Sequence, residues 1–207
     1  MLLLQSPSKR SLGIIKTLLC VLALLPFVRL LVFTFLDRLG ANPLEFIERN
    51  TGDWTLYFLC LTLSVTPLRR YTQWHWLLKM RRMLGLFVFF YATLHLLTFI
   101  WFDHFFDLPE MFKDVLKRPF IAVGLSAFVL LLPLALTSTN AMVRRLGGQR
   151  WQLLHRLIYV IGLLGVVHFW WMKAGKNDVA QPLLFALIMA LLLSLRIFWR
   201  YQKQRTS

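Results

Sequence analysis

An apolar run with two histidines, WQLLHRLIYVIGLLGVVHFW (Trp151–Trp170), carries the strongest structural signal in the sequence. A helix of 20 residues rises about 30 Å, which is the thickness of the hydrocarbon core of a bilayer. Ionisable side chains are expensive at that depth, and those found there are candidates for function by default. The run therefore predicts a membrane-spanning helix that carries chemistry.

The composition extends this interpretation to the whole chain. Its 207 residues are 58% apolar and 16% charged, whereas soluble domains are about 45–50% apolar and about 25% charged. These values exclude a cytosolic enzyme, a secreted disulfide scaffold and a disordered regulator. Cys20 and Cys60 both fall within apolar runs, so we expect small core residues rather than a metal site or a disulfide framework.

Six apolar runs predict an all-α membrane protein, a six-transmembrane helix bundle that forms a single domain over residues 1–207. Helices are expected because backbone polar groups in lipid must pair within the protein. The second run is short and is closed by Pro67. The predicted spans are roughly 12–36, 54–68, 83–102, 120–137, 152–172 and 182–198.

The order of the charges predicts the orientation. Basic residues precede the first run, lie between the second and third and between the fourth and fifth, and follow the sixth, whereas all nine acids lie in the alternate loops. Basic loops favour the cytoplasmic side, so both termini are predicted to be cytoplasmic. Topology thus explains the net charge of +15 without nucleic acid. The stretch Tyr71–Met80 is expected to form an interfacial helix on the inner surface.

Three of the five histidines lie inside predicted spans: His95, His155 and His168. His95 lies about 18 Å along the third span and His168 about 24 Å along the fifth, and both spans run outward. The pair can therefore reach a similar depth in the outer half of the membrane, as a bis-histidine haem requires. The alternatives are core histidines bonded between helices, a zinc site without a visible third ligand, and a proton relay without an acid in any span.

His155 lies near the inner surface, on a different stripe of the helix from His168. It could serve a flavin, a quinone or a second haem, for which Met80 or Met83 is the nearest candidate ligand. The alternative is an interfacial histidine that reaches the membrane surface. His75 and His104 are expected to be surface residues.

Four arginines are candidate contacts for a haem propionate, FMN or a quinone: Arg29, Arg81, Arg82 and Arg150. Arg29 lies in the outer half of the first span, where it either extends to the surface or pairs with a propionate. The other three belong to basic clusters at the inner ends of the third and fifth spans. The preference of basic residues for the cytoplasmic side explains those clusters. The alternative is an anion-binding site, because guanidinium groups bind phosphate and carboxylate groups well.

Several segments resemble the MsrQ (YedZ) family, whose members are haem-binding membrane subunits of bacterial methionine sulfoxide reductase systems. The resemblance covers nearly the whole chain. Its segments are RRMLGLFVFFYATLHL (Arg81–Leu96), TSTNAM (Thr137–Met142), RWQLLHRLIYV (Arg150–Val160), HFWW (His168–Trp171), LLPF at Leu24 and TPLRRY at Thr66. It implies a ferric-reductase-like transmembrane fold in the bacterial inner membrane, with haem b (one or two) and FMN. It also implies that His95 and His168 ligate the haem iron and that His155 is a further haem-associated position.

The resemblance further implies the partners. Electrons would come from quinol or a cytosolic flavin reductase and would cross the inner membrane to a periplasmic molybdopterin subunit, MsrP, which repairs oxidised proteins. The chain would be an electron-transfer subunit, with the sulfoxide chemistry in the partner. NADPH oxidases and ferric reductases are relatives with four such histidines and an attached flavin domain, whereas this sequence has three and no nucleotide-binding motif.

Two other functions stay open on the sequence. The first is a stand-alone cytochrome-b-type ferric or quinol-linked reductase, which would share the haem but release electrons to a small acceptor. The second is a transporter or assembly factor without a cofactor, although the broken helices and inverted repeats common in transporters are not evident.

Overall fold

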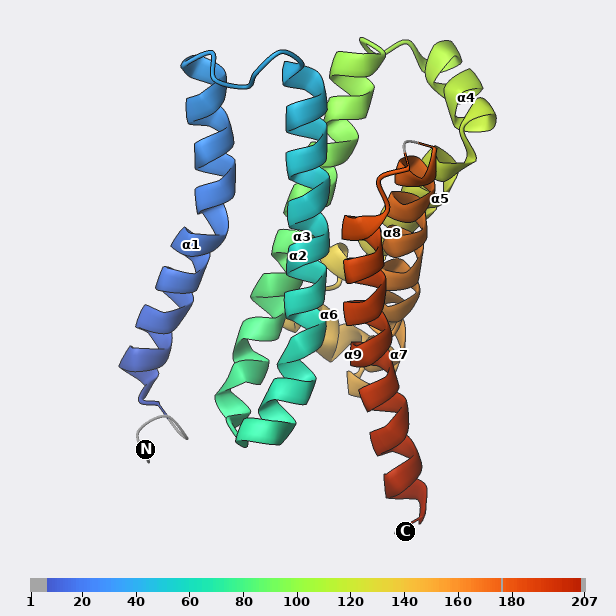
Figure 1. Cartoon of the computed structure of the whole chain (residues 1–207). Helices are drawn as coiled ribbons and strands as arrows, with labels where there is room; N and C mark the ends of the chain where they lie inside the picture. The colour runs from blue at the N-terminus through green and yellow to red at the C-terminus, as the bar shows by residue number, and fades with distance from the viewer. Residues whose placement is uncertain (1–6, 176, 206–207) are drawn as a thin grey trace. The chain divides into compact units, whose positions relative to one another are not determined.

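Figure 1 shows a computed structural model of the chain, which describes residues 7–175 and 177–205. Every regular element among these residues is a helix, which confirms the prediction of an all-helical protein. The chain divides between Phe105 and Phe106 into two compact units.

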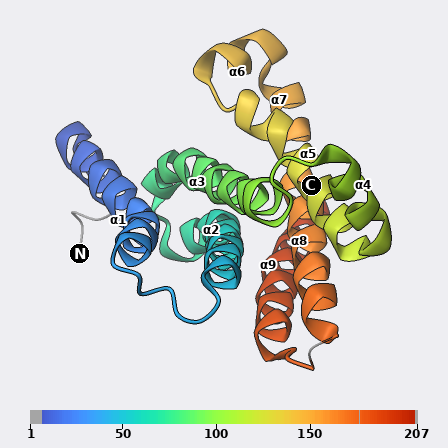
Figure 2. The same ribbon diagram turned by 90° about the horizontal axis from the view of Figure 1, so that it is seen from above.

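The first unit contains three long helices joined by short connections (Figures 1 and 2). The side chain of Asn42 begins the second helix by accepting a hydrogen bond from the Glu45 backbone N–H at 3.2 Å, with Pro43 in the first helical position. Its elements are α1 (Lys9–Phe35), α2 (Pro43–Thr72), the 3₁₀ turn η2 (His75–Leu77), α3 (Leu78–Leu97) and the π-helical segment η3 (Thr98–Asp103).

Helix α2 is the centre of this unit because it packs along α3. The Phe58 ring of α2 stacks on the Tyr91 ring of α3, with centroids 5.3 Å apart and planes 12° apart. The Tyr91 hydroxyl donates to the Ala23 carbonyl at 2.7 Å and so joins α1 to the α2–α3 pair. Leu63 and Val88 have no exposed surface.

The second unit is built on the pair α5 and α8, with α9 beside α8 (Figure 2). The Phe169 and Phe185 rings meet edge to face at 6.0 Å, and Arg196 Nη1 donates to the Tyr159 hydroxyl at 2.7 Å. Its elements are α4 (Leu108–Lys117), α5 (Pro119–Leu136), α6 (Asn140–Leu146), α7 (Gly148–Leu154), α8 (Leu157–Ala174) and α9 (Ala180–Arg205).

Five helical segments among the described residues are long and apolar enough to cross a membrane: Lys9–Phe35, His75–Asp103, Pro119–Leu136, Gly148–Ala174 and Ala180–Gln202. They indicate a multi-pass membrane protein. The predicted span 54–68 lies inside α2, which is long enough but is made less apolar by its hydroxyl side chains. Most of those hydroxyls bond to their own helix, as when Thr62 donates to the Phe58 carbonyl at 2.7 Å, whereas the buried Thr66 hydroxyl has no partner among the described residues. The second predicted span, 54–68, therefore stays a prediction.

The predicted fifth span, 152–172, lies within the apolar segment Gly148–Ala174, which is long enough to cross a membrane. Its helix is not continuous, however, because α7 ends at Leu154, a turn follows at His155 and Arg156, and α8 begins at Leu157. A second expectation, about the inner surface, is wrong. The stretch Tyr71–Met80 is not an interfacial helix of its own. It is divided among the end of α2, η2 and the start of α3, after Gln73 ends α2 in a left-handed conformation (φ 59°).

Helix α4, between the π segment and α5, has two distinct faces. Leu108, Phe112 and Leu116 recur every four residues on one face and are 69%, 65% and 66% exposed. Charged residues such as Lys113 and Lys117 lie on the opposite face, with half-buried apolar residues at the side. An exposed apolar face opposite a charged one is typical of a helix that lies in a membrane interface.

Candidate functional site

His95 lies on α3, half-buried, with its ring against α2. Its Nδ1 donates to the Glu48 backbone carbonyl at 3.0 Å, and the Thr51 hydroxyl lies 3.4 Å from the same nitrogen. Because a carbonyl only accepts hydrogen bonds, this contact places the ring proton on Nδ1. The lone pair is therefore on Nε2, the nitrogen that would bind a metal.

His168 lies on α8, half-buried, and repeats this arrangement against α5. Its Nδ1 donates to the Phe120 backbone carbonyl at 2.6 Å, which selects the same tautomer. The Phe120 ring lies close by, with its centroid 6.0 Å from that of the imidazole. Ligating histidines commonly donate their other ring N–H to a carbonyl in this way, which orients the ring and raises its basicity.

A glycine stands beside each of these two rings. A Cβ added at Gly52 would lie 3.2 Å from His95 Cε1, and one added at Gly124 would lie 2.7 Å from His168 Nδ1. Both distances are shorter than ordinary carbon contacts. Each imidazole therefore occupies the space that a side chain on the neighbouring helix would fill.

His155 is held differently, at the turn between α7 and α8. Its Nδ1 donates to the Trp151 carbonyl of its own helix at 3.0 Å, and its ring stacks on the Trp151 indole with centroids 3.8 Å apart. Its Nε2 lies 3.5 Å from the Ser138 hydroxyl, which itself donates to the Leu134 carbonyl. His155 therefore belongs to a polar cluster at the α5–α7 end of the second unit, separate from His168.

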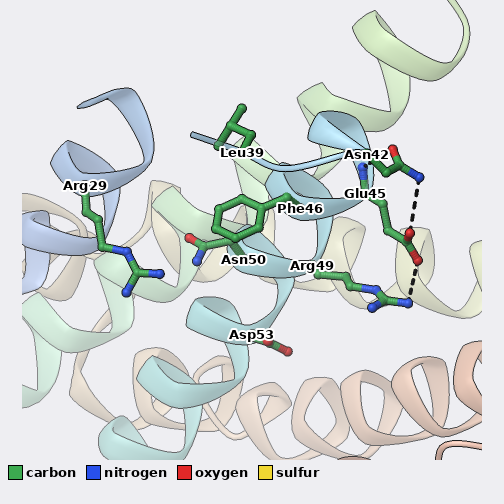
Figure 3. Close-up of a pocket in the computed structure, with 8 residues that line it drawn as sticks. All are labelled: Arg29, Leu39, Asn42, Glu45, Phe46, Arg49, Asn50 and Asp53. Atoms are coloured by element: carbon green, nitrogen blue, oxygen red, sulfur yellow. Dashed lines mark hydrogen bonds and ion pairs between the residues drawn. The ribbon is translucent and has the colours of Figure 1, made fainter. Parts of the chain in front are cut away.

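Arg29 borders a cavity of about 300 Å³ in the first unit (Figure 3). Its guanidinium carbon lies 5.1 Å from the centre of the Phe33 ring, within the range of a cation–π contact. The walls come from α1, the α1–α2 connection and the start of α2: Arg29, Leu39, Asn42, Glu45, Phe46, Arg49, Asn50 and Asp53.

The negative charge of Glu45 in this cavity is already paired with a positive one. Glu45 accepts from Arg49 at 2.5 Å and from Asn42 Nδ2 at 3.2 Å (Figure 3). The Asn50 Oδ1 atom is buried with no hydrogen-bond partner in the described part of the chain. The cavity can therefore receive a polar group that accepts from Arg29 and donates to Asn50.

The other three candidate arginines do not join Arg29. Arg81 and Arg82 stand at the start of α3, just after the α2–α3 connection and at the opposite end of the first unit from the cavity (Figure 1). Arg81 is half-buried and Arg82 is exposed. Arg150 lies on α7 in the second unit and is exposed. These residues remain candidates by position alone.

The sequence indicates the histidines as candidate ligands but does not indicate the groups that hold them. Each histidine donates to a carbonyl that lies 47 or 48 residues before it, and a glycine lies four residues after that carbonyl. The nearly equal distance in sequence from each glycine to its histidine is the signal that could have pointed to Gly52 and Gly124. The backbone carbonyls of Glu48 and Phe120 leave no trace in side-chain identity, so no motif could have revealed them.

Comparisons with known proteins agree with this architecture. Residues 12–166 match the family model described as ferric reductase like transmembrane component. Relatives named protein-methionine-sulfoxide reductase heme-binding subunit MsrQ include one from Herminiimonas arsenicoxydans, 67% identical over 96% of this chain and 91% of the relative. Those from Ralstonia nicotianae and Rhodospirillum rubrum are 57% and 48% identical, over 95% and 82% of this chain and 90% and 80% of the relatives. No solved structure matches.

The fold and the matched domain define a multi-pass membrane protein of the ferric-reductase-like class. Within that class the relatives cover almost the full length of the chain at high identity. The chain belongs to the MsrQ family, and the resemblance noted in the sequence is confirmed.

Proposed function

We propose that this chain is a haem b electron-transfer subunit of a methionine sulfoxide reductase system. The observation that carries the proposal is the matched state of His95 and His168. Each donates from Nδ1 to a helix carbonyl, so each presents a basic Nε2. The names of the relatives, which describe heme-binding subunits, support the same cofactor.

The residues present fit a bis-histidine haem. His95 and His168 would hold the iron, and the carbonyls behind them would keep the rings oriented and electron-rich. Bound haem supplies one-electron redox chemistry, and its potential is set by its axial ligands and their surroundings. Two protein ligands leave the iron no open position, which favours electron transfer over substrate activation. His155 would be associated with the same haem or a second one.

The remaining parts of the proposal concern placement and partners. We infer six spans, the second of them on α2, with both termini in the cytoplasm of a bacterial inner membrane and residues 1–207 acting as one domain. The basic loops support this orientation. Arg29, Arg81, Arg82 and Arg150 are the candidate contacts for propionate, FMN or quinone groups. Electrons would come from quinol or a cytosolic flavin reductase.

The electrons would leave to a periplasmic molybdopterin subunit of the MsrP type, where the sulfoxide is reduced. A stand-alone cytochrome-b-type ferric or quinol-linked reductase is the alternative, because the same histidines would serve it. The relatives favour the first function, since their names place them in a protein-methionine-sulfoxide reductase.

The proposal is tested by absorption spectra and haem assays on wild type and three histidine variants. We expect His95→Ala and His168→Ala each to abolish the low-spin spectrum, because each removes an axial ligand. His155→Ala should leave a partial spectrum. His104→Ala, outside α3 on the loop that follows η3, is the control and should match wild type. A full low-spin spectrum in either of the first two variants would overturn the ligand assignment.

A further inference from the structure

The two units hold their buried histidines by the same local arrangement. In an α-helix the carbonyl of one residue accepts from the N–H four residues later. Glu48 and Gly52 stand in that relation on α2, and Phe120 and Gly124 do so on α5. In each case the histidine of the partner helix donates to the first residue of the pair and contacts the second.

Helix geometry explains why the second residue of each pair is glycine. Side chains on a helix lean toward its N-terminus, so a side chain covers the turn that precedes its own Cα. A side chain at Gly52 or Gly124 would therefore lie over the carbonyl that accepts from the imidazole. Without that side chain, the ring can lie close to the helix and donate to a carbonyl that already accepts a backbone hydrogen bond.

We propose that Gly52 and Gly124 are positioning residues that set the orientation and tautomer of His95 and His168. Each unit then contributes one histidine, one carbonyl and one glycine, built alike. The proposal rests on the proposed haem ligation where it concerns the iron. The glycines act only through the rings and are not themselves expected to touch a cofactor.

Simple close packing of helices does not account for these glycines. Small residues in membrane helices usually let two backbones approach each other. At Gly52 and Gly124, however, all three nearest atoms to an added Cβ belong to the imidazole ring. Gly85 on α3 provides the contrast, because its added Cβ would meet only Thr62 Cγ2 at an ordinary 3.9 Å.

Alanine substitutions at the two glycines should differ in how strongly they displace the neighbouring imidazole. At Gly124 a methyl group would lie 2.7 Å from Nδ1 and 2.8 Å from Cε1 of His168, so the ring would have to turn away from the Phe120 carbonyl. At Gly52 the nearest ring atom, His95 Cε1, would be 3.2 Å away, and a smaller displacement would suffice. Gly124→Ala should therefore disturb its histidine more than Gly52→Ala does.

The experiment compares the full-length haem-loaded protein in four forms: wild type, Gly52→Ala, Gly124→Ala and Gly85→Ala. Electron paramagnetic resonance of the ferric low-spin haem reports the orientation of the axial rings, and redox titration gives the midpoint potential. Losing the bond from Nδ1 makes the ligand a weaker donor and favours ferrous iron. We expect a changed resonance and a raised potential in Gly124→Ala, a smaller change of the same sign in Gly52→Ala, and wild-type values in Gly85→Ala.

Other results are equally decisive. Loss of haem from a monodisperse Gly124→Ala protein supports the proposal if Gly85→Ala keeps its haem. If the Gly124→Ala protein does not accumulate, the resonance and midpoint potential of Gly52→Ala decide whether the positioning role holds. Wild-type resonance and potential in both glycine variants would overturn the positioning role. If His95→Ala and His168→Ala also kept the low-spin spectrum, the haem ligation itself would be wrong, so the two failures are distinguishable.

Discussion

His95 and His168 show how a membrane helix can direct an imidazole without any charged neighbour. The usual orienting partner of a metal-bound histidine is a carboxylate, a carbonyl or a water. A carboxylate within the span would be expensive, whereas a helix carbonyl is already present and can accept a second hydrogen bond. The cost is a neighbouring position that must have no side chain, which is where Gly52 and Gly124 stand.

Arg29 offers a test of its own. If its guanidinium pairs with a haem propionate, as we propose, removing the positive charge should lower the haem midpoint potential, because ferric iron is then less disfavoured. We expect a lower potential in Arg29→Gln with full haem loading, measured by redox titration. Arg10→Gln, exposed in the first turn of the same helix, is the matched control. An unchanged potential in Arg29→Gln would count against the pairing.

Most helices could be predicted from the sequence, because apolar length is a direct consequence of the bilayer's thickness. The predicted spans 12–36 and 120–137 lie within three residues of α1 and α5. The break at His155 could not be predicted, since an apolar run looks the same on either side of a turn. The surface helix α4 was also missed, because its apolar residues are spread among charges.

Helix α2 is the element whose relation to the membrane needs an experiment. It is 30 residues long, or about 45 Å, which exceeds the hydrocarbon thickness. Its charged residues lie toward both ends, and most hydroxyls between them bond to their own backbone, as Thr55 does to the Thr51 carbonyl at 2.9 Å. Thr66 is the exception, because its buried hydroxyl has no hydrogen-bond partner in the described part of the chain. A helix whose hydroxyls are mostly paired in this way can cross lipid with few unpaired polar groups.

We predict that the two ends of α2 lie on opposite sides of the membrane. In a background without Cys20 and Cys60, single cysteines replace Ala41, just before α2, and Gln73, just after it. A membrane-impermeant maleimide should label the first from the periplasm of intact cells and the second only in inverted membrane vesicles. Labelling of both from the same side would show that α2 does not cross, and the six-span topology would fail.

For the whole molecule, each of the two units holds one of the proposed ligands by the same local arrangement. The class of protein could be predicted from the resembling segments, and the three histidines stay predictions, made because ionisable residues stand out in apolar runs. The bonds that orient them could not, since they use backbone atoms of α2 and α5. The proposed pairing of His95 with His168 would make neither unit sufficient by itself.

The destination of the electrons separates the two proposed functions. Membranes containing the chain would be reduced with a quinol, and the reoxidation of the haem would be followed at its absorption band. We expect fast reoxidation on adding a periplasmic MsrP-type protein together with a methionine sulfoxide substrate, and slow reoxidation by the substrate alone. His104→Ala membranes, whose spectrum should match that of wild type, are the control and should be reoxidised equally fast. Rapid reoxidation by a ferric chelate, with no response to the partner protein, would favour the stand-alone reductase.

The wide turn that follows His95 has a consequence for how such proteins diversify. A π-helical turn is an α-turn with one residue inserted, and η3 begins at Thr98, three residues beyond the imidazole. Insertions or deletions in the loop that follows can therefore be absorbed by converting this turn to α-helical winding or back. Lineages could lengthen or shorten that loop while the register between His95 and Glu48 stays as it is.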